Sequence, residues 1–149
     1  MLTVKQLNAR IRRKVRARAP KKPKGPNLNE TRFNRLLLAG EGLYEPCRII
    51  ITRKKKRRYT PDFLYRGAYI EVKGDYRLRS EDRARLAFEF AAEANTGTPF
   101  VWARWAGIGK GYLCEMWYKD EILERYCLTN EEFVAFLAGN AERKDKRKI

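Results

Sequence analysis

Three ionisable side chains near the middle of the chain, Asp62, Glu71 and Lys73, have types and spacing suited to metal-assisted phosphodiester chemistry. Paired carboxylates hold Mg²⁺ through oxygen ligands, and the bound metal polarises a phosphoryl oxygen and acidifies a water molecule. A lysine beside them adds a positive charge that stabilises negative charge developing on phosphorus. We therefore expect Asp62 and Glu71 to be metal ligands and Lys73 to be catalytic.

These residues lie in two segments rich in β-branched and aromatic residues, 59–65 and 68–74, joined by an Arg-Gly pair. This pattern predicts the two strands of a hairpin. Because side chains alternate across a strand, Glu71 and Lys73 share one face, and the apolar residues between and before them point to the other. Asp62, near the middle of the first strand, is expected to reach the same place. The alternative is an ordinary strand with a Glu and a Lys on its solvated face.

A third carboxylate, Glu30, begins a segment with helical spacing of apolar residues that runs to Ala39 and stops at Gly40. Glu30 lies on the same stripe as Phe33 and Leu37, so it is expected to face inward, where a carboxylate needs a partner. We interpret it as a further metal-site residue. The alternative is a first-turn glutamate stabilised by the helix dipole.

The formal net charge is +16, and the 149 residues include no histidine. A surplus of this size favours a polyanionic partner, and nucleic acid is the natural one. The lack of histidine excludes a histidine general base, a Ser-His or Cys-His pair and His-ligated zinc. Carboxylate and lysine chemistry remains.

Basic residues are concentrated in the arm 1–26, in the run 53–58 and before the helix that Ser80 is expected to cap. The run should form a hairpin loop that contacts phosphates beside the site. The arm is interpreted as a DNA-contacting segment, with a solubilising tail as the alternative. The predicted DNA-binding residues are Arg53, Lys54, Lys55, Lys56, Arg57, Arg58, Arg77, Arg79, Arg83, Lys21, Lys22 and Lys24.

The three cysteines, Cys47, Cys114 and Cys127, are too few and too scattered for a zinc ribbon or a disulfide framework. We interpret them as small buried hydrophobic residues in a reducing compartment. No long apolar run indicates a membrane segment, and the N-terminal segment lacks the apolar region of a signal peptide. An intracellular location is expected.

The remaining segments predict further strands and helices. Residues 43–52 read as a strand, and 100–105 and 112–118 as two more. In the helix after Ser80, a stripe of Leu86, Phe90 and alanines 87, 91 and 94 should pack on the sheet. Three tryptophans, Trp102, Trp105 and Trp117, either stack on unpaired bases or, as is commoner in strands, fill the core.

A last helix begins at a predicted capping box of Thr129 and Glu132, buries Phe133 and its apolar neighbours, and ends at Gly139. After it comes a second basic tail. The triplet beginning at Glu142 has the same Glu-x-Lys pattern as residues 71–73, but no strand is expected in so polar a segment.

At Pro61-Asp62 and Glu71-Val72-Lys73 the chain resembles the PD-(D/E)XK nuclease superfamily. Within it, the chain is most similar to the phage endonuclease I family, which resolves four-way DNA junctions. The similar pieces are Asn29-Glu30, Tyr59-Thr60-Pro61-Asp62-Phe63-Leu64, Glu71-Val72-Lys73-Gly74 and Ser80-Glu81-Asp82-Arg83, spread over residues 29 to about 104.

The resemblance implies an α/β fold with a restriction-endonuclease-like core, in which helices flank a central mixed sheet of about five strands. The chain is then expected to divide into a basic arm at 1–26, a nuclease domain at 27–140 and a basic tail at 141–149. The implied catalytic set is Glu30, Asp62, Glu71 and Lys73, with two divalent metals, normally Mg²⁺ with Mn²⁺ as a substitute. It also implies a homodimer whose protomers exchange segments.

The function expected on these grounds is cleavage of branched DNA such as four-way (Holliday) junctions. An alternative of the same class is a phage-type nuclease that nicks, degrades or repairs other DNA. An alternative of a different class is a packaging or RNA-binding protein without catalysis, which would have no use for the aligned Asp62, Glu71 and Lys73.

Overall fold

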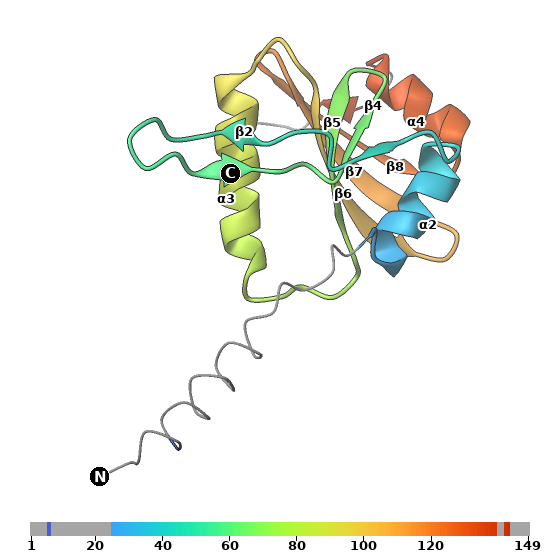
Figure 1. Cartoon of the computed structure of the whole chain (residues 1–149). Coiled ribbons are helices and arrows are strands. Elements are labelled where there is room, and N and C mark those ends of the chain that lie inside the picture. The colour runs from blue at the N-terminus through green and yellow to red at the C-terminus, as the bar shows by residue number, and fades with distance from the viewer. Residues whose placement is uncertain (1–5, 7–24, 140–141, 144–149) are drawn as a thin grey trace.

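The computed structural model describes residue 6, residues 25–139 and residues 142–143 (Figure 1). The helices are α2 (Leu28–Leu37), α3 (Glu81–Ala94) and α4 (Asn130–Leu137). The strands are β1 (Leu43–Tyr44), β2 (Ile49–Ile50), β3 (Arg58–Tyr59), β4 (Phe63–Tyr65), β5 (Ala68–Lys73), β6 (Phe100–Gly107), β7 (Gly111–Tyr118), β8 (Glu121–Cys127) and β9 (Glu142–Arg143).

A seven-stranded mixed sheet runs through the molecule in the order β1-β4-β5-β6-β7-β8-β9, and β2 and β3 form a separate two-stranded sheet. Only the β5–β6 pair is parallel, with α3 as its crossover. An α/β fold with a mixed central sheet flanked by helices is therefore present. The expected strand number of about five was too low, because β8 went unrecognised and β9 is a two-residue edge.

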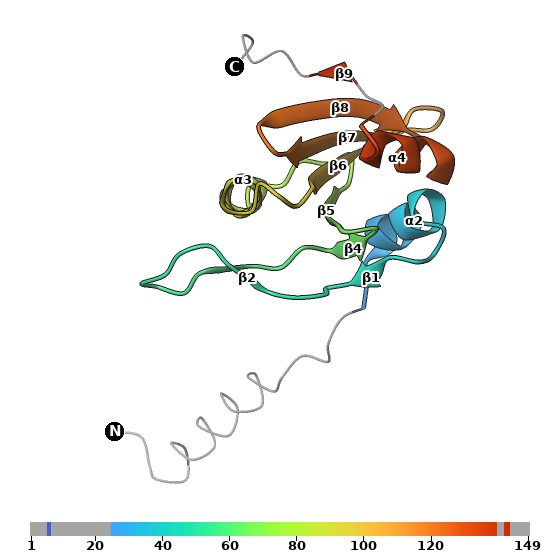
Figure 2. The same cartoon turned by 90° about the horizontal axis from the view of Figure 1, so that it is seen from above.

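Helices cover both faces of the main sheet (Figure 2). On one side, α2 and α4 enclose a core that includes Phe33, Ile70 and Phe133. On the other side, α3 and the two-stranded sheet enclose a smaller core around Phe88 and Trp102. Strand β5 lies between the two cores, so each of its faces is buried in a different environment.

The two predicted strands that precede β5 are each broken in two. Segment 59–65 is interrupted at Pro61, which lacks the N–H needed to continue a ladder, so Tyr59 belongs to β3 and Phe63 to β4. Segment 43–52 is interrupted at Glu45, where φ is +43°. The β4–β5 turn is as predicted, since Arg66 and Gly67 both have positive φ, the backbone of a tight hairpin turn.

The inward face of α3 agrees with the prediction at Ala87 and Ala91, which belong to or pack against the smaller core, and differs at Leu86 and Phe90. Leu86 and Phe90 are 53% and 49% exposed, whereas Phe88, Ala91 and Ala92 are buried. Phe88 packs against both Tyr59 and Trp102, so the buried stripe of α3 is rotated about the helix axis from the predicted one. Its side-chain cap is also missing, since the hydroxyl of Ser80 makes no cap hydrogen bond.

The end of the chain also differs in part. Helix α4 begins as predicted, with the Glu132 N–H donating to Thr129 Oγ1 at 3.2 Å, but the Glu132 carboxylate accepts from the Leu128 N–H instead of closing the box. Beyond it, Glu142 and Arg143 form β9 against β8. A strand exists there because the edge of β8 offers main-chain partners to any sequence. The predicted boundary at residue 141 therefore precedes a strand of the main sheet.

Two of the three cysteines are buried as predicted. Cys114 and Cys127 are buried free thiols, and Cys47 is half-buried. None of the helices in the described part of the chain has the length and hydropathy needed to span a bilayer. Trp102 is a core residue, only 7% exposed, and Trp105 and Trp117 are half-buried against the two cores.

Candidate active site

Glu71 and Lys73 lie on the same face of β5, as the alternation predicts. Lys73 Nζ is 2.8 Å from Glu71 Oε1, and the Tyr59 hydroxyl donates to Glu71 Oε2 at 2.9 Å. Glu71 is buried on the α3 side of the sheet. Both of its oxygens therefore have partners, and its direction is fixed.

Asp62 reaches β5 from the break between β3 and β4. Its N–H donates to Ile70 O at 2.9 Å, and its Oδ2 accepts from the Val72 N–H at 2.7 Å. The Asp62 carboxylate thus accepts the Val72 N–H of β5, a hydrogen bond that a main-chain carbonyl would accept if β4 continued. This pairing brings Asp62 beside Glu71 as expected, although Asp62 is not within a strand.

Glu30 comes to the same region from the first turn of α2, and it is buried as predicted. It forms a capping box with Asn27: the Glu30 N–H donates to Asn27 Oδ1, and the Asn27 N–H donates to Glu30 Oε2, both at 2.9 Å. Glu30 lies in the first turn of α2, where a helix-dipole role was the alternative to a metal role, and it has a capping role there that was not predicted. This role does not remove Glu30 from the site, because α2 begins beside the end of β5.

Gly74 permits this close approach of α2 to β5. A Cβ at Gly74 would lie 2.6 Å from Asn29 Nδ2, closer than atoms can pack. Any other residue would require the Asn29 side chain, at the start of α2, to move. The glycine after the Glu-x-Lys sequence thus has a packing role.

The three carboxylates are close enough to perturb one another. The pKa of Asp62 is raised to about 8, first by burial and then by the charges of Glu71 and Glu30, against a hydrogen bond from Val72. Burial also raises the pKa of Glu71, although Lys73 and Tyr59 oppose the shift. A concentration of buried negative charge with one nearby lysine is typical of functional sites.

A cleft of about 300 Å³ opens over these groups. Its walls include Glu30, Asp62 and Lys73, together with Glu81 from the first turn of α3. Glu71 is not among the lining residues, but it contacts Lys73, which is. The cleft has room for a phosphate group with part of its nucleotide.

The residues fit a hard divalent cation by donor type, since carboxylate oxygens are the ligands that Mg²⁺ and Mn²⁺ take. Their side chains do not form a preorganised coordination site. Among the described residues, no three His, Cys, Asp or Glu side chains converge as metal ligands. Glu30 and Glu71 would have to exchange Asn27 and Lys73 as partners before they coordinated a cation.

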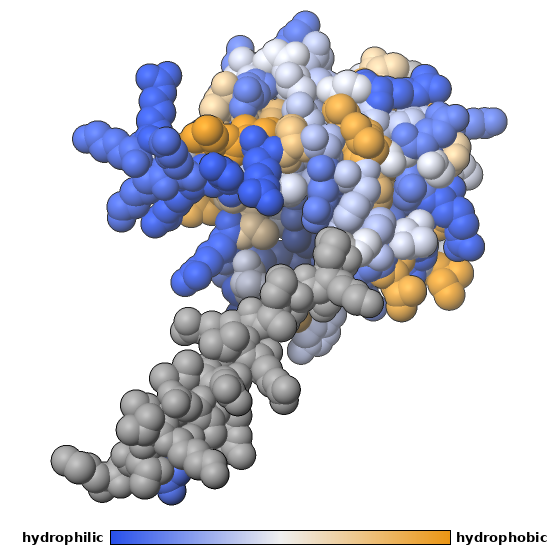
Figure 3. Space-filling view, viewed as in Figure 1, coloured by the Kyte–Doolittle hydropathy of each residue, from blue (hydrophilic) through white to orange (hydrophobic). Residues whose placement is uncertain are grey.

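The basic run 53–58 lies toward the tip of the β2–β3 hairpin, which crosses α3 and projects beyond it (Figures 1 and 3). All six of its side chains are exposed. Arg79 and Arg83 are also exposed beside the cleft, whereas Arg77 is ion-paired with Asp82 at 2.7 Å. The predicted contacts Lys21, Lys22 and Lys24 lie outside the described residues.

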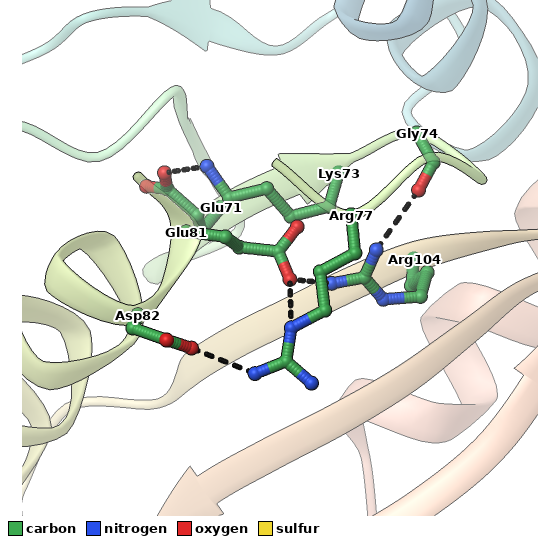
Figure 4. A network of polar contacts seen from close by, with 7 residues as sticks. All are labelled: Glu71, Lys73, Gly74, Arg77, Glu81, Asp82 and Arg104. Carbon is green, nitrogen blue, oxygen red and sulfur yellow. Dashed lines mark hydrogen bonds and ion pairs between the residues drawn. The ribbon is translucent and has the colours of Figure 1, made fainter. Parts of the chain in front are cut away.

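Sequence reasoning missed three residues that shape this site: Tyr59, Glu81 and Arg104. Arg104 lies in β6, opposite Lys73 in the parallel ladder. Its guanidinium forms an ion pair with the buried Glu81 (Figure 4). Tyr59 was recognised only as a strand residue. No local pattern predicts these contacts: Tyr59 reaches Glu71 from β3, and Arg104 meets Glu81 only through the crossover by α3.

No protein-family model matches the chain, and neither curated proteins nor solved structures include a significant match. The class that the fold and the site define is an α/β protein with a cleft of buried carboxylates and a lysine.

Proposed function

We propose that the protein is a metal-dependent DNA endonuclease of the PD-(D/E)XK type, which hydrolyses phosphodiester bonds in branched DNA such as four-way junctions. The observation that carries the proposal is the cleft lined by Glu30, Asp62 and Lys73, in which Lys73 is the ion-pair partner of the buried Glu71. Burying carboxylates together is unfavourable without a cation. Burial and, after it, the charges of Glu71 and Glu30 raise the pKa of Asp62, and a divalent metal would offset both.

Asp62, Glu71 and Glu30 are the residues that would hold Mg²⁺, with Mn²⁺ as a substitute. When bound, such a metal supplies Lewis-acid polarisation of the phosphoryl oxygen and a more acidic water. Lys73 stabilises negative charge on the phosphate at the mouth of the cleft, and its ammonium is already oriented by Glu71. Tyr59 holds the second oxygen of Glu71, which keeps that carboxylate directed toward Lys73.

The remaining parts of the proposal concern DNA and assembly. The exposed tip of the β2–β3 hairpin and the arginines beside the cleft provide sequence-independent phosphate contacts. Opposed cuts across a branch need two sites related by a two-fold axis, so the working form is proposed to be an intracellular homodimer with exchanged segments.

The test is single-turnover cleavage of a labelled four-way junction in Mg²⁺, with a matched duplex, a single strand and RNA beside it. Asp62→Asn, Glu71→Gln and Lys73→Ala each remove one group of the site. We expect the cleavage rate to fall on the order of a hundredfold or more in each variant. Binding titrated in Ca²⁺ should persist, because the other basic residues still contact the phosphates.

Matched controls are Asp120→Asn and Lys110→Ala, which remove the same charges from exposed positions that do not line the cleft. Both should cut at the wild-type rate. Wild-type rates in all three site variants would overturn the proposed function.

A further inference from the structure

The segment between β5 and α3, residues 75–80, forms the outer rim of the cleft, and we refer to it as the rim loop. Two of its apolar side chains, Tyr76 and Leu78, line the cleft and are nevertheless 77% and 60% exposed. Single exposed apolar residues are ordinary on a protein surface. Here two exposed apolar residues lie together at the mouth of the carboxylate cleft, where a ligand in the cleft would meet them.

The rim loop is fixed in place at both ends (Figure 4). At its start, Arg104 donates to Gly74 O at 3.1 Å and pairs with the buried Glu81. At its end, the Glu81 N–H donates to Leu78 O at 3.1 Å.

Arg77, between the two apolar residues, donates to Asp82 at 2.7 Å and lies 3.7 Å from Glu81. Its own side chain therefore points back toward α3. These ion pairs hold the backbone between Tyr76 and Leu78 in place, and both apolar side chains remain exposed. Little backbone ordering is therefore needed when the ring binds.

An exposed aromatic ring beside a phosphate site is the arrangement that binds an unpaired nucleobase by stacking. Bases within a continuous duplex are already stacked on both sides and offer no free face. An unpaired base offers one, and the cations of the rim loop and the hairpin tip neutralise the attached phosphates. Duplex binding would gain little from Tyr76, whereas binding of unpaired nucleotides would gain from it directly.

We propose that Tyr76, supported by Leu78, stacks on an unpaired base next to the phosphate in the cleft, and so selects DNA that contains unpaired nucleotides at the cleavage position. This inference rests on the proposed function for the position of the phosphate. It makes Tyr76 a specificity-determining residue, and it makes the ion pairs of Arg77, Glu81 and Arg104 the support that positions it.

The test measures binding without cleavage. Single-stranded DNA, a duplex with a short unpaired gap and a continuous duplex, each carrying 2-aminopurine, are titrated with the full chain in Ca²⁺. Wild-type protein should quench the fluorescence of an unpaired 2-aminopurine by stacking. Tyr76→Ala should abolish the quenching and weaken binding of the single strand and the gapped duplex by about tenfold, with little change for the continuous duplex.

Tyr76→Phe keeps the ring and should restore both signals. Tyr126→Ala is the matched control, because Tyr126 is 50% exposed but does not line the cleft. It should bind like the wild type. An equal loss of affinity on all three DNAs, or none on any of them, would overturn the inference.

The outcome for the rim loop is separable from that for the nuclease. If no DNA is cut in Mg²⁺ but Tyr76-dependent quenching is present, the stacking site stands and the proposed catalysis fails. If DNA is cut while Tyr76→Ala leaves the preference for unpaired DNA unchanged, the catalysis stands and the stacking site fails.

Discussion

The two faces of β5 contrast sharply, although they belong to one six-residue strand. On the α2 and α4 side, Ile70 and Val72 are at most 5% exposed within an apolar core. On the α3 side, Glu71 is equally enclosed but carries a charge, with Lys73 beside it. Burial alone therefore does not distinguish the two faces; the chemistry of the buried groups does.

One face of β5 contributes to stability, and the other carries the groups suited to chemistry. Removing apolar surface from water is favourable, so the face with Ile70 stabilises the sheet. Burying carboxylates beside one another is unfavourable, as the raised pKa of Asp62 records. We infer that the apolar face offsets the free-energy cost of burying the carboxylates. Substitutions on either face test this inference.

The largest effect is expected on the apolar face. Ile70→Ala leaves a cavity between α2 and β5, because Ile70 is fully buried there, and should lower the free energy of unfolding by about 2–5 kcal/mol. Denaturant unfolding followed by tryptophan fluorescence measures it. Ile108→Ala, at a residue 99% exposed, is the control and should change nothing. A loss for Ile70→Ala no greater than the control's would mean that this face contributes little.

The next effect concerns the cation expected on the polar face. If Asp62 and Glu71 bind a divalent metal only in the folded state, Mn²⁺ at a hundredfold excess over its dissociation constant should stabilise the protein by about 2.7 kcal/mol. Thermal unfolding with and without the metal measures this shift, which should disappear in Glu71→Gln. Equal stabilisation of the wild type and Glu71→Gln would place the metal elsewhere.

The smallest effect is the pH dependence of the metal-free protein. Because folding raises the pKa of Asp62 to about 8, the folded state binds this proton more tightly than the unfolded state. The resulting stability is present below the ordinary aspartate pKa and is lost as the pH rises toward about 8. Asp62→Asn keeps the acceptor for the Val72 N–H without the charge.

In EDTA at pH 8, Asp62→Asn should therefore be more stable than the wild type by at least ~1 kcal/mol, equivalent to about 3 °C in Tm, with the gain shrinking toward pH 4. Thermal melts across this range measure it. A gain of the same size at pH 4 would attribute the effect to packing and not to charge.

Local sequence patterns determined much of this molecule. Alternation in residues 68–73 predicted β5 and the shared face of Glu71 and Lys73, and helical spacing predicted that Glu30 faces inward. These predictions succeeded because the period of the backbone alone decides which side chains share a face. The Arg66-Gly67 turn followed likewise from the backbone conformation that its hairpin requires.

Tertiary structure decided the features that depend on which elements meet. The Phe88 face of α3 and the edge strand β9 both follow from available neighbours rather than from local pattern. The ion pair of Glu81 with Arg104 exists only because β6 returns parallel to β5 after α3. Contacts between residues so far apart in the chain are set by packing of the whole domain, which no periodicity in one segment encodes.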